Sequence, residues 1–117
     1  MGLRKMVDRL RTPVEELDRR DLASFCSTLD GVPLDELAPR QRARIAGEVR
    51  AVRIVPRANA DALEAIVSDG RGSVTAVFLG RRHLAGVTPG RRLVFEGMVT
   101  DDGDQLAVFN PVYELLS

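Results

Sequence analysis

The chain has 117 residues, enough for one domain with a small addition and for one modest core. Its 17 basic and 17 acidic side chains cancel, so the net charge gives no argument for a nucleic-acid partner and only the distribution of charge is informative. No apolar run reaches the ~18 residues of a membrane span, the N-terminus lacks the apolar stretch of a signal peptide, and the single Cys26 excludes an internal disulfide. We therefore expect a cytoplasmic protein without a membrane partner.

Residues 1–38 are predicted to form an N-terminal helical extension. The run Thr12-Pro13-Val14-Glu15 is typical of a helix start, because a capping hydroxyl precedes a proline and a carboxylate follows three residues on. Asp30-Gly31 is typical of a helix end, and residues 33–37 predict one further helical turn. Between these signals, an apolar stripe at helical spacing is formed by Leu22, Phe25 and Leu29. Cys26 lies beside this stripe, and we expect it to be a small buried residue.

A long strand is expected next, over residues 45–54. Its apolar alternation changes phase near Arg50-Ala51, so one extra residue has to be absorbed by a β-bulge, and such a strand bends. A bent strand can contribute to two faces of a small closed barrel.

Residues 63–79 predict a hairpin, because two runs of apolar residues flank the turn Asp69-Gly70-Arg71-Gly72. Alternation places one set of side chains in the core: Leu63, Ala65, Val67, Val74, Ala76 and Phe78. It places the other set on the outer face of the hairpin: Glu64, Ile66, Ser68, Thr75, Val77 and Leu79. The N-terminal helix is the obvious candidate to cover that outer face, and if it lies elsewhere the apolar patch invites a partner or a second copy.

The remaining chain predicts a short helix over residues 81–86, a fourth strand, an acidic turn over 100–104 and a fifth strand from Leu106 to Phe109. The fourth strand points four residues inward: Leu93, Phe95, Gly97 and Val99. This order predicts a mainly β protein, a five-stranded OB-fold Greek-key barrel over residues 39–117 with an N-terminal helical extension over residues 1–38.

Several runs also resemble those of a family of small actinobacterial OB-fold proteins described as nucleic-acid-binding-domain proteins. The resemblance covers about residues 41–116 and rests on Ser68-Asp69-Gly70-Arg71-Gly72-Ser73, Val77-Phe78-Leu79-Gly80-Arg81-Arg82, Gly86-Val87-Thr88-Pro89-Gly90-Arg91-Arg92-Leu93, Glu96-Gly97 and Asn110-Pro111-Val112-Tyr113-Glu114-Leu115. More distantly, the strand pattern is similar to the OB wedge domain of branch-migrating helicases. The resemblance implies the fold and nucleic-acid binding, although this chain has Phe78 where members of that family usually have Trp.

Positive charge is concentrated where that fold binds ligands. Residues 41–100 hold ten arginines against five acidic residues, and OB-folds bind single strands across strands two and three and between the loops after strands one and four. Arginine can neutralise a phosphate and stack on a base. We predict a nucleic-acid groove lined by six arginines: Arg50, Arg53, Arg57, Arg71, Arg81 and Arg82.

Several of these residues, and the function itself, allow a second interpretation. Arg81 and Arg82 fit a phosphate clamp and, equally well, ion pairs with Asp69 or Glu96. Phe109 and Tyr113 could offer stacking surfaces, with core packing favoured. We expect no cofactor, no metal site and no enzyme, since the chain has one histidine and lacks a set of nucleophile, base and metal ligands. The first expectation is a module that binds single-stranded or branched nucleic acid, DNA or RNA, and the second is a protein-interaction module or homodimer that uses the outer face of the hairpin.

Overall fold

The structure is a computed structural model that describes residues 16–116. The predicted helix start at Thr12 lies outside the described residues, and residues 16–27 are helical. The predicted turn is a single 3-10 turn, η1, over Leu34–Glu36. Six strands follow: β1 (Arg42–Arg57), β2 (Ala60–Ser68), β3 (Ser73–Leu79), β4 (Arg92–Asp102), β5 (Gln105–Phe109) and β6 (Val112–Leu115).

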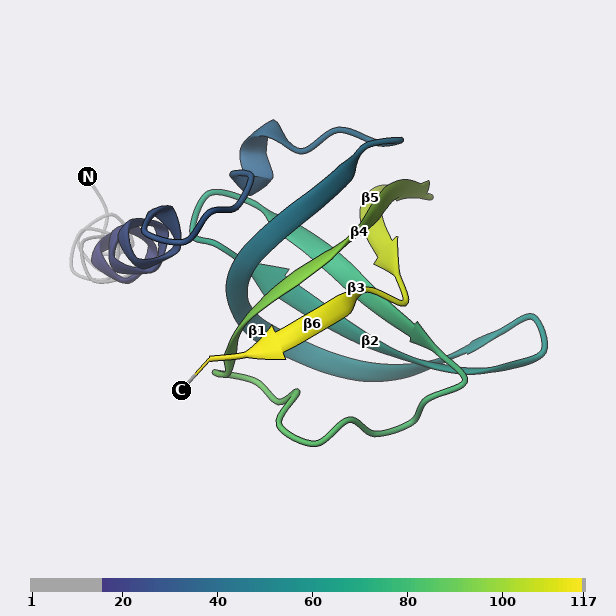
Figure 1. Ribbon diagram of the computed structural model, residues 1–117. Helices are drawn as coiled ribbons and strands as arrows, with labels where there is room; N and C mark the ends of the chain where they lie inside the picture. Colours follow the sequence, from purple (N-terminus) through teal and green to yellow (C-terminus); the bar gives the residue numbers. More distant parts are fainter. Residues whose placement is uncertain (1–15, 117) are drawn as a thin grey trace, which may run out of the picture.

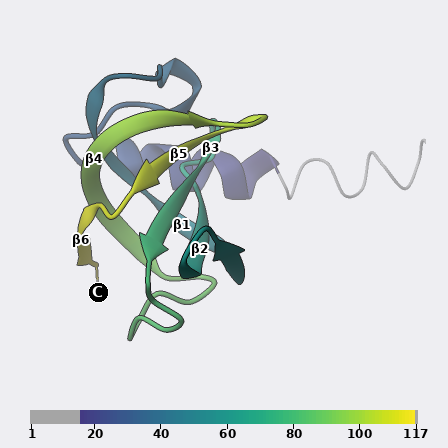
Figure 2. The same ribbon diagram turned by 90° about the vertical axis from the view of Figure 1, so that its right-hand side faces the viewer.

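The strands form one mixed sheet in the order β1-β2-β3-β5-β4-β6, and a further pairing between β1 and β4 closes five of them into a ring (Figures 1 and 2). β3 and β5 are parallel, and all other pairs are antiparallel. The prediction of five strands misses β6, which follows β5 after Asn110-Pro111 and pairs with the first half of β4. The predicted helix over residues 81–86 is also wrong, because the described chain runs from β3 to β4 without a helix.

β1 belongs to both sides of the ring. Residues 42–48 pair with β4 and residues 48–57 pair with β2, and the register shifts between Val49 and Ala51. This confirms the predicted β-bulge. Gly47 lies at the bend, where a Cβ atom would come within 2.5 Å of Val67 Cγ1. Glycine is therefore needed for β1 to pass so close to β2.

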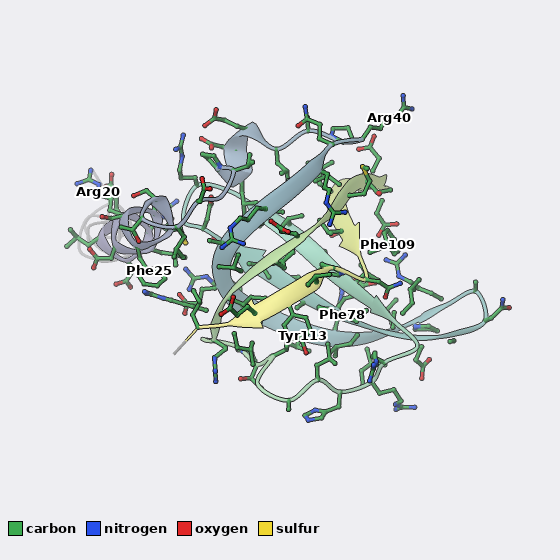
Figure 3. All side chains as sticks on the ribbon, viewed as in Figure 1. Arg20, Phe25, Arg40, Phe78, Phe109 and Tyr113 are labelled. Atoms are coloured by element: carbon green, nitrogen blue, oxygen red, sulfur yellow. The ribbon has the colours of Figure 1, made fainter. Side chains whose placement is uncertain are left out.

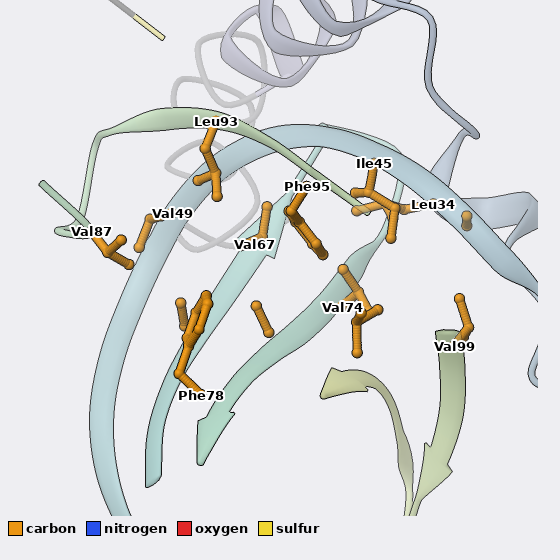
Figure 4. Close-up of a cluster of buried hydrophobic side chains, with 14 of the residues drawn as sticks. Leu34, Ile45, Val49, Val67, Val74, Phe78, Val87, Leu93, Phe95 and Val99 are labelled. Atoms are coloured by element: carbon orange, nitrogen blue, oxygen red, sulfur yellow. The ribbon is translucent and has the colours of Figure 1, made fainter. Parts of the chain in front are cut away.

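The main core lies inside the ring (Figure 4). All six hairpin residues that the alternation places in the core are buried, as are Leu93, Phe95 and Val99 from β4. Leu34 of η1 joins the same cluster, and Tyr113 packs edge-on against Phe78 with their ring centroids 5.5 Å apart. The predicted inward faces of β2, β3 and β4 are thus confirmed.

The helix over residues 16–27 covers the outer side of β1 and β4. Leu22 and Cys26 are buried against Ala46 and Val94, and burial raises the pKa of the Cys26 thiol. Figure 1 shows this helix at one end of the molecule, while the connection between β1 and β2 projects at the opposite end. The hypothesis that the helix covers the outer face of the hairpin is therefore wrong. None of the described helical residues forms a segment long and apolar enough to cross a membrane.

The turn between β2 and β3 is the point where the N-terminal segments dock. Asp69 is buried and accepts hydrogen bonds from the backbone N–H groups of Leu34 at 2.8 Å, Arg71 at 2.9 Å and Gly72 at 3.0 Å. Gly70 has a φ of +86°, and a Cβ atom there would collide with the carbonyl oxygen of Arg19. The turn glycine that marks a hairpin in the sequence therefore also makes room for the helix.

Candidate functional site

The outer face of the hairpin is mostly covered, although not by the N-terminal helix. Val77 is fully buried, because β5 lies beside β3 and places Ala107 and Phe109 against it. Of the three apolar residues of this face, only Leu79 is strongly exposed, at 45%. A partner that docks here meets a narrower apolar surface than the alternation predicts.

A buried carboxylate lies at the centre of this face. Glu64 is only 1% exposed. Its Oε1 accepts hydrogen bonds from Nε of Arg53 at 3.1 Å and from Nη2 at 2.9 Å. Its Oε2 accepts hydrogen bonds from Nε of Arg57 at 3.0 Å and from Nη2 at 2.7 Å. Two guanidinium groups thus compensate the cost of burying one carboxylate.

The strand geometry explains this arrangement. Arg53 is the register partner of Glu64 across the β1–β2 pair, and Arg57 follows four residues later on the same side of β1. Successive side chains of a strand alternate between its two faces, so residues four apart point the same way. Both arginines therefore reach the same carboxylate.

Arg57 also bridges the end of β1 to the end of β4. Its Nη2 donates to Oδ2 of Asp102 at 2.7 Å, and its guanidinium carbon lies 5.1 Å from the ring centroid of Phe109. The hydrogen bond from Arg57 holds the pKa of Asp102 below its usual range, and the bonds to Asp102 and Glu64 raise the pKa of Arg57. We call Arg53, Arg57, Glu64, Asp102 and Phe109 the Arg57 network; Figure 3 labels Phe109 on β5.

Three of the other predicted arginines have acidic partners outside the Arg57 network: Arg50, Arg71 and Arg82. Arg71 binds Asp35 with Nη2 to Oδ2 at 2.9 Å, beside η1. It lies at the opposite end of the hairpin from the Arg81-Arg82 pair, about 20 Å away, since the seven residues of β3 separate them. Arg50 is exposed, and its nearest carboxylate is that of Glu48 at 4.0 Å.

Arg82 points to the other side of the β1–β2 pair. Its Nη1 lies 3.1 Å from Oδ2 of Asp61, whose side chain alternates away from that of Glu64. Together with Arg53 and His83 it lines a groove of about 340 Å³ that also includes Leu63 and the exposed Ile54. Arg81 is exposed and forms no ion pair with any described residue.

The predicted alternative, in which Arg81 and Arg82 form ion pairs with Asp69 or Glu96, is wrong. Asp69 is used by backbone N–H groups of the turn, and Glu96 lies 3.7 Å from Arg44.

Only two of the six predicted arginines, Arg53 and Arg57, thus bind the same carboxylate, and Arg53 also lines the groove with Arg82. The Arg57 network adds Glu64 and Asp102, which the sequence does not predict as site residues, and Phe109, for which it favours core packing over a stacking surface. A signal was present for Arg53 and Arg57, because they are four residues apart on one strand. The network contains two positive and two negative groups, so its net charge is zero.

No protein-family model matches the chain, and no curated protein sequence does. The resemblance to small actinobacterial OB-fold proteins therefore stays a prediction.

Proposed function

We propose that the ring of five strands is an OB-fold barrel that binds single-stranded or branched nucleic acid without catalysing a reaction. The ring order β1-β2-β3-β5-β4, the long bulged first strand and the parallel β3–β5 pair support this fold. In an OB-fold the ligand crosses strands two and three between the loops after strands one and four. Here those loops are residues 58–59 and 103–104.

The Arg57 network lies between these two loops. Arg57 is the last residue of β1 and Asp102 the last residue of β4, and Glu64 is on β2. The single observation that carries the proposal is the guanidinium of Arg57 held over the ring of Phe109 at 5.1 Å. Stacked aromatic and guanidinium planes are what OB-folds offer to bases, and arginine also binds phosphate.

The proposed binding is weak and depends on salt. Arg53 is 51% exposed and adjoins Arg57, so a strand that crosses the face meets few cationic groups. A small number of phosphate contacts supports low affinity that falls steeply as salt rises, with little sequence preference.

Fluorescence anisotropy tests the proposal. A labelled single strand of about 20 nucleotides exceeds the roughly 4 to 16 nucleotides that one OB-fold covers. It is titrated with the protein at low and at near-physiological salt. Arg57→Ala should weaken binding about fivefold or more, since a base stacked on a planar side chain contributes about 1–3 kcal/mol. Phe109→Leu should weaken binding less, because the ring of Phe109 supports the Arg57 guanidinium and does not itself meet the base.

Arg71→Ala is the matched control. It also removes an arginine from a carboxylate partner, but at the other end of the hairpin, and should leave the affinity unchanged. Absence of binding by the wild-type chain at low salt would refute the proposal. Equal losses in Arg57→Ala and Arg71→Ala would show that charge alone, and not the Arg57 network, binds the strand.

A further inference from the structure

Arg57 has two carboxylate partners that differ in their exposure. Glu64 is 1% exposed and is shared with Arg53, whereas the side chain of Asp102 is 26% exposed. Asp102 is the last residue of β4, next to the turn at Gly103. A molecule arriving from solvent can therefore reach the Arg57–Asp102 contact but not the Arg57–Glu64 contact.

We propose that Asp102 occupies on Arg57 the position that a phosphate of the ligand takes, so that Asp102 acts as a built-in competitor of the nucleic acid. This inference rests on the proposed function. Carboxylate and phosphate oxygens make the same charge-assisted contacts with a guanidinium group, so either can bind its outer edge. Asp102 uses that edge with Nη2–Oδ2 at 2.7 Å and Nη1–Oδ1 at 3.5 Å.

The charge balance points in the same direction. With Asp102 in place, the two arginines and two carboxylates of the network cancel. Without Asp102, the network carries one net positive charge beside the ring of Phe109. Glu64 keeps its bonds to both arginines in either case, because it is buried and bonds to Nε of each. Displacement of Asp102 thus creates a phosphate site without moving the arginine that forms it.

Binding of a fluorescein-labelled oligothymidylate of about 20 nucleotides at low salt tests this inference. Asp102→Asn should bind the strand about three- to tenfold more tightly than wild type, since it removes a partly exposed ion pair and the repulsion of an incoming phosphate. Asp102→Glu keeps the charge and should resemble wild type. In the Arg57→Ala background, Asp102→Asn should give no gain.

Asp61→Asn is the matched control, because it frees Arg82 from an ion pair on the other side of the β1–β2 pair. It should change the affinity less than Asp102→Asn. Thermal unfolding of each variant verifies that it is folded.

The outcomes separate the two proposals. If Asp102→Asn binds as wild type while Arg57→Ala binds more weakly, the competitor role is overturned and the proposed function stands. Weaker binding by folded Asp102→Asn would make Asp102 a ligand contact and overturn the inference. If neither wild type nor Asp102→Asn binds, the proposed function fails, and the inference fails with it.

Discussion

Replacement of Glu64 by glutamine tests whether the Arg57 network holds the face together. The substitution keeps the size of the side chain and removes its charge. Glutamine retains one acceptor oxygen, while its NH₂ group faces the guanidinium of the second arginine, so donors oppose donors. Two of the four hydrogen bonds to Arg53 and Arg57 are lost.

The magnitude follows from the burial of each partner. Two hydrogen bonds to a charged group contribute about 1.5–3 kcal/mol each, which sets an upper limit of about 6 kcal/mol. The freed arginine regains part of this from water, because Arg53 is 51% and Arg57 is 23% exposed. We expect Glu64→Gln to lower the free energy of unfolding by about 2–4 kcal/mol. At roughly 4 °C per kcal/mol for a chain of this size, the Tm falls by about 8–16 °C.

Urea and thermal unfolding followed by circular dichroism measure this loss. Glu96→Gln is the control, because Glu96 lies 3.7 Å from Arg44 and the two side chains are 42% and 41% exposed, so we expect a loss of about 0–1 kcal/mol. A loss in Glu64→Gln within about 1 kcal/mol of the loss in Glu96→Gln would show that the buried carboxylate is not the structural centre of the network.

Three further predictions concern other parts of the molecule. Gly70→Ala should destabilise the chain by at least 1–2 kcal/mol more than Gly80→Ala in urea unfolding, because both positions have positive φ but only a Cβ at Gly70 meets the helix; equal losses would contradict the docking of the helix on the turn. The pKa of Asp102 is lowered in the folded chain. The stability of wild type relative to Asp102→Asn should therefore be constant above about pH 5 and decline as the pH falls below about 4. A stability difference that persists undiminished at pH 2 would argue against the ion pair. Cys26 is buried with a raised pKa, so Ellman's reagent should label it at pH 8 only as fast as the chain opens, and labelling at the rate of a free thiol would show that the helix does not cover it.

The hairpin and the bulge could be predicted because they depend on local pattern. Alternation assigned the inward residues of β2 and β3, and a phase change located the bulge beside Ala51. The short helix predicted over residues 81–86 is absent from the connection between β3 and β4, which carries Leu84 and Val87. Both residues pack on the main core, so tertiary contacts hold this segment without a helix.

The site was harder to predict, because its contacts join distant parts of the chain. Arg53 and Arg57 share a face by strand geometry alone, but their common contact with Glu64 depends on the register between β1 and β2. The contact between Arg57 and Asp102 spans 45 positions and requires the ring to close. Core packing is favoured over stacking for Phe109 in the sequence, since nothing local shows that the Arg57 guanidinium lies over its ring.

Ring closure also has a consequence for how the chain folds. Arg42, the first residue of β1, pairs with Met98, whereas β2 and β3 are joined by a tight turn. Loop-closure entropy favours the local hairpins, so we expect β1, β2 and β3 to assemble first and β4 to join later. Until β4 arrives, residues 42–48 present an unpaired strand edge, which is a template for association with other chains. A chain that is still being synthesised passes through this state. If β4 joins late, the chain should refold in milliseconds to seconds and not in microseconds.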